Sequence, residues 1–398
     1  MRILPTQLVK PGMRLGRSIF DPSGRLVIAA GITLHQRLLD LLVRQGYSAV
    51  YIADAFGDVD LPELVSLETR QEVTRCITDL MREEAMATQR LALQAPFAEA
   101  RNPAGQVMMA KHRHEMTLRV ARAAELLVNE VMSRPEVLIG LVDIKSLHDY
   151  SFAHSVQVAL NCLVVGKMLG LKPNELKELG AGALLHDIGK TAVPSQIWGK
   201  EGDLTPEEFE RVQTHPEAGF EILRRTELGL LPAHIAYQHH ERWDGSGYPR
   251  GLKDREVLKY ARICAVCDVF DAMTSDRPYK KATHPFNGLA FVIENAGILF
   301  DPEVTEAFSK VVAPFPVATG VKLSTGESAI VKKLNPRALD KPIVVAVKTA
   351  DGRFYSTPRQ INLISESDVR IVSYIDWYTA SLETELMAAS GLASDVVQ

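Results

Sequence analysis

Hydrophobic and polar positions alternate in short runs along residues 1–60, a pattern that predicts several strands and one helix. Residues 21–24, Asp-Pro-Ser-Gly, are typical of a turn between two strands. Thr33 is a suitable N-cap for a helix whose leucines share one face, and Gly46 ends that helix. A short strand over 49–52 follows. We therefore expect a small N-terminal α/β module.

The pattern becomes helical and strongly charged over residues 62–93. Pro96, Pro103 and Gly105 then lie among alanines and polar residues, a composition typical of a linker. We therefore expect a helical segment and linker over residues 61–111.

Residues 112–312 have helical spacing almost throughout, with loops marked by glycine and proline. Asn174 is a suitable cap for a helix that brings His186 near its end. Residues 260–274 form another predicted helix, and the long helix over 114–132 is a candidate dimer stalk.

Strands return after Pro314 and predict a small C-terminal β module over residues 313–398, with a frayed tail after Leu386. Asp351-Gly352 is a strong hairpin signal. The predicted strands are 321–323, 329–333, 343–348 and 354–355. The predicted fold is therefore mainly α, with an all-helical central domain and small β-rich modules at both ends.

Composition narrows the class of protein. The 398 residues are 46% hydrophobic and 24% charged, with a formal net charge of -4. The net charge therefore provides no electrostatic attraction to duplex nucleic acid or to anionic membranes. No apolar stretch approaches the length of a membrane span, and the first residues lack a signal-like segment, so we expect a cytoplasmic protein. Cys264 and Cys267 have redox-motif spacing but lie in an apolar helical run, which favours a packing role.

The most informative residues are histidines and aspartates spread over about a hundred positions. Imidazole and carboxylate together suit first-row transition metals, and an aspartate beside a histidine can bridge two ions. Seven such groups are too many for one ion and suit two, which would form a clamp for in-line attack on a phosphate. The pattern therefore predicts a dinuclear metallohydrolase. The candidate metal ligands are His154, His186, Asp187, His215, His239, His240 and Asp268.

These residues stand in recognisable motifs. His-Asp-Ile-Gly-Lys at 186–190 resembles the HD half of the HD-GYP phosphodiesterases, and Gly247-Tyr248-Pro249 resembles the GYP half. The resemblance covers roughly half of the chain, about 112–312. Other matching segments are His-Pro-Glu-Ala-Gly at 215–219, His-His-Glu-Arg-Trp-Asp-Gly at 239–245, Asp-Val-Phe-Asp-Ala at 268–272, Arg-Pro-Tyr at 277–279 and Phe-Asp-Pro at 300–302.

The resemblance implies an all-helical catalytic domain that hydrolyses cyclic di-GMP to linear pGpG or onward to GMP. It implies two metal ions, iron or manganese. One ion would be held by His154, His186 and Asp268, with Asp187 bridging to a second ion held by His215, His239 and His240. A hydroxide activated between the ions would attack phosphorus.

It also implies roles for residues around the metals. Lys190 would steady the leaving oxygen or a phosphate oxygen, and Asp271 would orient the hydroxide or a guanine. Arg277 and Lys280 would hold phosphate, with arginine suited to a bidentate contact. The loop residues Gly247, Tyr248 and Pro249 would form part of the substrate site, with the glycine allowing close backbone approach.

One position departs from the pattern. Family members with three metals carry a glutamate four residues before the first histidine, and here Tyr150 stands in its place. We therefore expect two metals, in which case hydrolysis would stop at the linear dinucleotide.

Other functions stay open. One is a receptor that binds the dinucleotide without hydrolysis, although a receptor has no need of a full ligand set. Another is an HD-type phosphohydrolase acting on a different nucleotide, such as a mixed guanine-adenine cyclic dinucleotide. Expected partners are cyclic di-GMP, a GGDEF-type or other signalling protein at the GYP loop and a second copy of the chain, with no nucleic acid.

Overall fold

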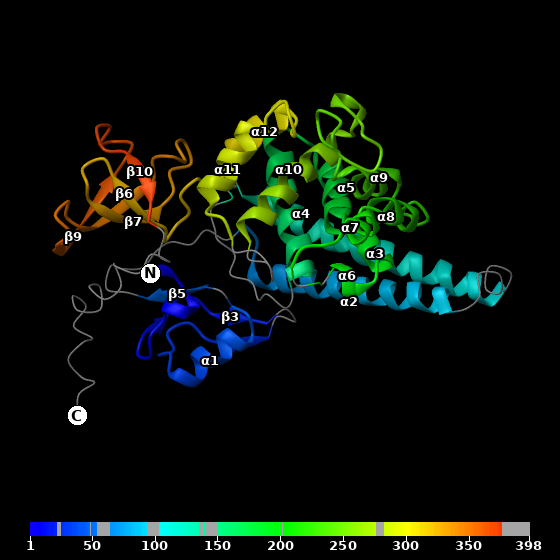
Figure 1. Ribbon diagram of the computed structural model, residues 1–398, viewed down its shortest axis with the longest axis horizontal. Helices are drawn as coiled ribbons and strands as arrows, with labels where there is room; N and C mark the ends of the chain where they lie inside the picture. Colours follow the sequence, from blue (N-terminus) through cyan, green and yellow to red (C-terminus); the bar gives the residue numbers. More distant parts are fainter. Residues whose placement is uncertain are drawn as a thin grey trace.

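The computed structural model of the protein has a helical central part and one small β module near each end of the chain (Figure 1). It describes residues 1–21, 25–47, 49–53, 64–93, 103–134, 139, 150–198, 200, 202–275 and 282–375. The predicted fold class, mainly α with terminal β modules, is confirmed.

The N-terminal module contains a three-stranded antiparallel sheet in the order β1-β5-β2 and a separate β3-β4 pair. The predicted cap at Thr33 is wrong: Thr33 pairs in extended conformation with Arg14, and His35 is the N-cap of the helix. Residues 22–24 of the predicted turn lie outside the described residues, although β3 and β4 flank them as expected. The elements are β1 (Arg2–Pro5), η1 (Thr6–Leu8), β2 (Arg14–Leu15), β3 (Ile19–Phe20), β4 (Leu26–Ile28), α1 (Gln36–Arg44) and β5 (Ala49–Ala53).

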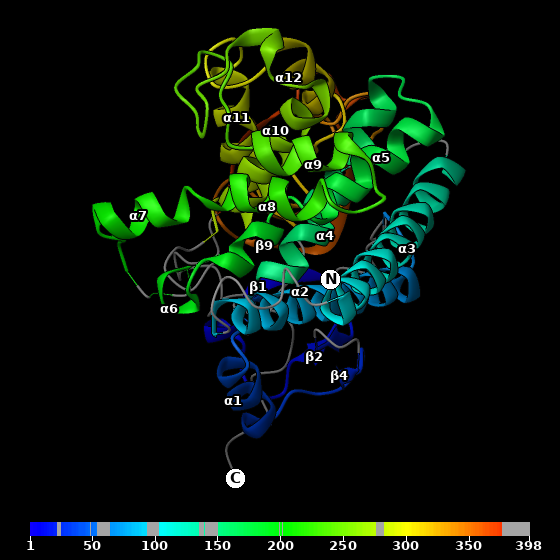
Figure 2. The same cartoon turned by 90° about the vertical axis from the view of Figure 1, so that its right-hand side faces the viewer.

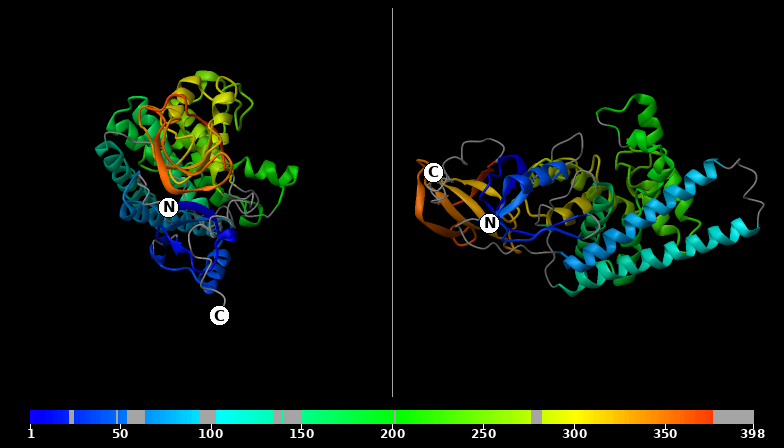
Figure 3. Two further views of the ribbon diagram at one scale, coloured as in Figure 1. Left: turned by 90° about the vertical axis from the view of Figure 1, so that its left-hand side faces the viewer. Right: turned by 90° about the horizontal axis from the view of Figure 1, so that it is seen from below.

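Two long helices, α2 (Leu67–Leu93) and α3 (Pro103–Ser133), lie side by side as a hairpin that projects from the helical part (Figures 1 and 3). The linker predicted around Pro103 and Gly105 is wrong for these two residues, because α3 begins at Pro103 and the first turn of a helix accommodates proline. Pro96 lies outside the described residues.

Side chains of this hairpin belong to the same hydrophobic core as the helices that follow. Val73 and Ile77 of α2 and Leu127 of α3 are fully buried in that core. The boundary predicted between residues 111 and 112 falls inside α3, and the division into four parts stays a prediction.

The central helices pack around this core, with α6 and α7 projecting on one side (Figure 2). Asn174 does not cap its helix: Lys172 is the N-cap, Pro173 occupies the first turn, and the Glu175 carboxylate accepts the Lys172 backbone N–H at 2.8 Å. The elements are α4 (Tyr150–Met168), α5 (Pro173–Leu184), η3 (Ile188–Ala192), α6 (Ser195–Trp198), α7 (Pro206–Val212), α8 (His215–Leu223), α9 (Leu230–Gln238), η4 (Asp254–Glu256), α10 (Lys259–Thr274), α11 (Pro285–Glu294) and α12 (Pro302–Ser309).

The C-terminal module is a five-stranded antiparallel sheet in the order β10-β6-β7-β8-β9, and both predicted hairpins are confirmed. It contacts α11, because the Tyr374 ring stacks on His284 at a centroid distance of 3.9 Å. The predicted tail after Leu386 lies outside the described residues. The strands are β6 (Gly320–Leu323), β7 (Ser328–Lys333), β8 (Ile343–Lys348), β9 (Phe354–Asn362) and β10 (Ile371–Tyr374).

Two smaller predictions also concern the helices. Cys264 and Cys267 are buried thiols on α10, which agrees with a packing role. Within the described part of the chain, no helix is both long and apolar enough to cross a membrane.

Candidate metal centre

Imidazole and carboxylate side chains from five separate segments meet inside the helical part. His154 lies near the start of α4, and His186 and Asp187 lie between α5 and η3. The remaining members are His215 at the start of α8, His239 and His240 directly after α9, and Asp268 in α10. All seven side chains are buried except that of His240, which is half-buried.

The seven side chains form two groups. We call His154, His186 and Asp268 the first group, and Asp187, His215, His239 and His240 the second group. Within each group, one potential ligand atom per residue lies within 4.8 Å of the others. The structure thus brings together all seven of the residues predicted as metal ligands.

The outer nitrogens of the histidines fix which nitrogen faces the centre. Nδ1 of His186 lies 2.8 Å from the Ala183 carbonyl oxygen, and His215 and His239 make the same contact to the carbonyl three residues earlier, at 2.7 and 2.9 Å. A carbonyl oxygen can only accept, so each Nδ1 carries the proton. In the neutral ring, Nε2 therefore presents a lone pair to the centre.

Asp187 lies between the two groups. Its Oδ2 is 3.4 Å from Nε2 of His186, and its Oδ1 is 3.4 Å from Nε2 of His215 and 3.8 Å from Nε2 of His239. Lys190 donates to Oδ2 at 2.5 Å. One carboxylate oxygen thus faces each group, which is the geometry that a bridging ligand requires.

Burial sets the charge of the second group. It lowers the pKa of His215 to about 4, and it lowers the pKa values of His239 and His240 well below the usual histidine range. Burial opposes ionisation of Asp187, but Lys190 and His186 hold its pKa well below the usual range. Neutral imidazole and ionised carboxylate are the forms that bind metal.

His186 behaves differently. Burial by itself would lower the pKa of His186, but the adjacent Asp187 carboxylate raises it by more than burial lowers it, and the resulting pKa is about 10. A cation bound at this position, whether a proton or a metal ion, is therefore stabilised by Asp187.

Two observations test whether the centre fits metal ions. Among the described residues, His186 Nε2 and Asp187 Oδ1 are buried atoms without a hydrogen-bond partner, a costly arrangement unless a cation binds them. The Nε2 atoms of His215 and His239 lie 3.3 Å apart with no proton between them in their neutral forms. Two lone pairs that face each other at this distance repel unless a cation lies near both. The donor set therefore fits divalent metals.

The loop at Gly247, Tyr248 and Pro249 packs directly on the segment that carries His240. A Cβ atom on Gly247 would lie 2.5 Å from the His240 carbonyl oxygen, so only glycine fits there. The Tyr248 ring stacks on the His240 ring at 4.7 Å, and the Tyr248–Pro249 peptide bond is cis. The loop therefore supports a metal-ligand candidate.

Glu241 precedes this loop and has a role that the sequence did not reveal. Its carboxylate is buried and accepts the backbone N–H groups of Arg250 at 2.8 Å and Leu252 at 3.0 Å. Its position directly after the two histidines was the available signal, because a buried glutamate needs hydrogen-bond donors nearby.

The structure describes only some of the residues that the sequence placed around the metals. Lys190 contacts Asp187, as given above, while Arg277 and Lys280 lie outside the described residues. Tyr150 is the first residue of α4, and its side chain is not described.

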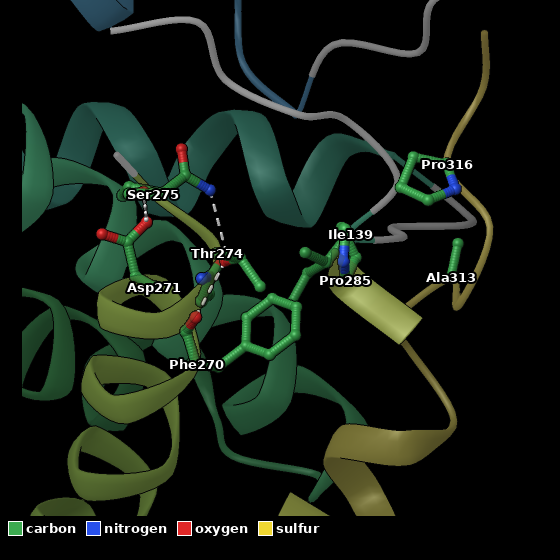
Figure 4. A pocket seen from close by; sticks show the side chains of 10 residues that line it. Ile139, Phe270, Asp271, Thr274, Ser275, Pro285, Ala313 and Pro316 are labelled. Atoms are coloured by element: carbon green, nitrogen blue, oxygen red, sulfur yellow. Dashed lines mark hydrogen bonds between the residues drawn. The ribbon is translucent and has the colours of Figure 1, made fainter. Parts of the chain in front are cut away.

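Asp271 contacts a ligand candidate. Its Oδ2 accepts a hydrogen bond from Nδ1 of His154 at 2.6 Å. It also lines a small pocket of mixed polar and apolar lining, with a cavity volume of about 30 Å³, room for one or two water molecules (Figure 4). None of the seven ligand candidates lines that pocket.

The chain resembles known proteins over this same region. The HD domain family model matches residues 125–304. A cyclic di-GMP phosphodiesterase of Pseudomonas aeruginosa is 35% identical over 340 residues, which is 82% of this chain and 78% of the relative.

Other relatives match shorter stretches. A cyclic di-GMP phosphodiesterase response regulator of Xanthomonas campestris is 43% identical over 36% of this chain and 39% of its own length. A 3′3′-cGAMP-specific phosphodiesterase of Vibrio cholerae is 36% identical over 44% of this chain and 38% of its own length. Among solved structures, an HD-GYP-like protein of Bdellovibrio bacteriovorus matches 78% of this chain and 98% of its own, with 13% identity and a TM-score of 0.44.

Proposed function

Because the chain belongs to the HD-GYP family, we propose that it is a metal-dependent phosphodiesterase that hydrolyses cyclic di-GMP. The observation that carries the proposal is the arrangement around Asp187, which directs one oxygen to each of two ligand groups. The relative from Pseudomonas aeruginosa, named a cyclic di-GMP phosphodiesterase, supports the substrate.

The metals that we propose are two divalent transition-metal ions, iron or manganese. The first group and the second group would each hold one ion, with Asp187 shared between them. Imidazole and carboxylate ligands suit these metals. When bound, the pair would supply a nucleophile from water at neutral pH and offset the charge of the phosphate.

The chain's own residues would do the remaining work. Lys190 places its ammonium group beside Asp187, where it can contact a phosphate oxygen or the leaving oxygen. Gly247, Tyr248 and Pro249 would border the substrate next to His240. We further propose Arg277 and Lys280 as phosphate contacts, on the strength of the sequence motif alone.

The extent of hydrolysis follows from the number of metals. Tyr150 stands where three-metal members of the family have a glutamate, so we propose that linear pGpG is the first product and that GMP forms slowly or not at all.

A second substrate is also favoured by an observation. The relative from Vibrio cholerae, named as specific for 3′3′-cGAMP, is 36% identical over 176 residues. A mixed cyclic dinucleotide is therefore the first alternative substrate to assay. The non-hydrolytic receptor is disfavoured, because the two ligand groups are complete.

We also propose a cytoplasmic homodimer that contacts a GGDEF-type signalling partner through the GYP loop. The dimer is supported by apolar side chains exposed on α3: Val107 and Met108 near one end, and Leu118 within the predicted stalk.

The experiment that tests the function joins metal analysis to product analysis. The protein is purified without oxygen, its iron and manganese are counted, and it is incubated with cyclic di-GMP or 3′3′-cGAMP. We expect about two metals per chain and conversion of cyclic di-GMP to pGpG. Full metal loading with tight binding but no hydrolysis of either substrate would support the receptor instead.

A further inference from the structure

His154 is held in a different way from His186, His215 and His239. The Nδ1 atoms of His186, His215 and His239 each donate to a backbone carbonyl of the preceding turn. Nδ1 of His154 instead donates to the carboxylate of Asp271, at 2.6 Å. His154 thus has a charged side chain from another helix where these three have neutral backbone.

Two carboxylates of α10 enclose the His154 ring. Asp268 Oδ1 lies 3.0 Å from its Nε2, and Asp271 Oδ2 lies 2.6 Å from its Nδ1. The two aspartates are three residues apart, so they lie on neighbouring faces of α10, and both reach the one imidazole that α4 presents.

Asp271 is itself fixed in place. It is 3% exposed, and its Oδ1 accepts a hydrogen bond from Ser275 Oγ, one turn later on α10, at 3.2 Å. Both side chains line the small pocket together with Thr274 (Figure 4). Gln157 and Asn161 also line it. The Asp271 carboxylate therefore contacts a metal-ligand candidate on one side and lines a separate small pocket on the other.

We propose, on the basis of the function proposed above, that Asp271 is a positioning residue that sets the metal affinity of the first group. An ionised carboxylate that accepts Nδ1–H fixes the tautomer and makes Nε2 a stronger ligand. The second group has no such carboxylate behind His215 or His239. Asp271 therefore tunes one metal position and leaves the other unchanged, whereas the sequence led us to expect that it would orient the hydroxide or a guanine.

Two substitutions separate charge from geometry. Asp271→Asn keeps an oxygen that can accept the hydrogen bond from Nδ1–H of His154 but removes the negative charge. Asp271→Ala removes the acceptor as well. Loss of such an outer partner typically weakens metal binding by about 10–100-fold, so we expect a loss of that size for asparagine and a larger one for alanine.

The matched control is Thr274→Val. Thr274 lines the same pocket on the same helix, and its hydroxyl donates to the Phe270 carbonyl of its own helix. The change is close to isosteric, so affinity at both metal positions should match that of the unmodified protein.

The experiment measures Mn²⁺ binding to metal-depleted full-length protein by equilibrium dialysis, with no substrate present. In Asp271→Asn, we expect one Mn²⁺ to bind with unchanged affinity and the other to bind more weakly. In Asp271→Ala, we expect the same pattern with a larger loss at the weakened position. Unchanged affinity at both positions, or equal loss at both, would overturn the proposal. Thermal unfolding of the metal-free variants checks that each is folded, and Asp271→Asn, the more conservative change, decides the outcome if Asp271→Ala is not.

This result is independent of the enzymatic assay. If the unmodified protein binds Mn²⁺ at two positions but hydrolyses no cyclic dinucleotide, the proposed function fails, whereas the role of Asp271 still stands or falls on the dialysis.

Discussion

Gly189 and His215 are in backbone contact: a Cβ atom added to Gly189 would lie 1.9 Å from the His215 carbonyl oxygen. Gly189 follows the His186-Asp187 pair in η3, and His215 begins α8. The glycine therefore allows the two segments to approach until Asp187 faces the His215 imidazole.

Replacing Gly189 with alanine should move α8 away from η3, because the obstacle is backbone and not the end of a flexible side chain. We expect loss of metal from the second group with retention in the first, measured as metal per chain after dialysis. Gly180→Ala is the control, since the added Cβ would meet side chains and no backbone, the tip of Leu163 at 3.3 Å and the Ala124 Cβ at 3.6 Å. Equal metal content in both variants would contradict the expectation.

Asp187→Ala should remove the ligand shared by the two groups. Both metals should be lost and turnover abolished, because His186 and His215 would each lose the carboxylate that faces them. Metal analysis and product chromatography check this together. Retention of metal at the unmodified level would exclude a bridging role.

Glu241→Gln should loosen the GYP loop and leave the metals in place. Glutamine offers one acceptor where the carboxylate accepts two backbone N–H groups, so a buried donor loses its partner, at a cost of about 1–3 kcal/mol. We expect lower stability in urea and a raised KM, with unchanged metal content. Glu256→Gln, which alters a comparable bond to an exposed backbone N–H, is the control. A fall in kcat alone would argue against a loop role.

The stability of the metal-free protein should fall on the acid side. The pKa of His215 is about 4 in the folded state against about 6.5 when unfolded, so the unfolded chain binds more protons between these values. The free energy of unfolding should therefore decrease as pH falls through this range. His239 and His240, whose pKa values burial also lowers, act in the same direction.

His186 has the opposite effect on the alkaline side. Its pKa of about 10 means that its contribution is fully present below about 6.5 and is lost as pH rises through 10. Urea midpoints of chelator-treated protein should therefore be highest near neutrality. A midpoint that keeps increasing below about pH 6 would contradict the neutral state of the second group.

Arg277→Ala, predicted from the motif, should raise KM for cyclic di-GMP and leave the metal content intact, because its role is contact with phosphate. Lys281→Ala is the control from the same segment. If metal is lost from the Arg277 variant, the assignment as a substrate contact is wrong.

The sequence alone determined which residue types are present and how they are spaced. Helical periodicity over 260–274 was sufficient to place Asp268 and Asp271 on neighbouring faces of what became α10, and Asp351-Gly352 was sufficient for the β8–β9 hairpin. These features depend on residues a few positions apart, so local spacing reports them. The ordered motifs also indicated the seven ligand candidates, because each motif is a short local segment.

The tertiary structure decided what the side chains do to one another. The contact of Asp271 with His154 joins residues 117 positions apart, and the placing of Asp187 between His186 and His215 depends on how η3 packs against α8. Competition between neighbouring residues for the capping position decided where α5 begins, and Lys172 rather than Asn174 is its N-cap. Periodicity identifies the buried face of a helix, but only the packing of several helices determines which buried side chains meet.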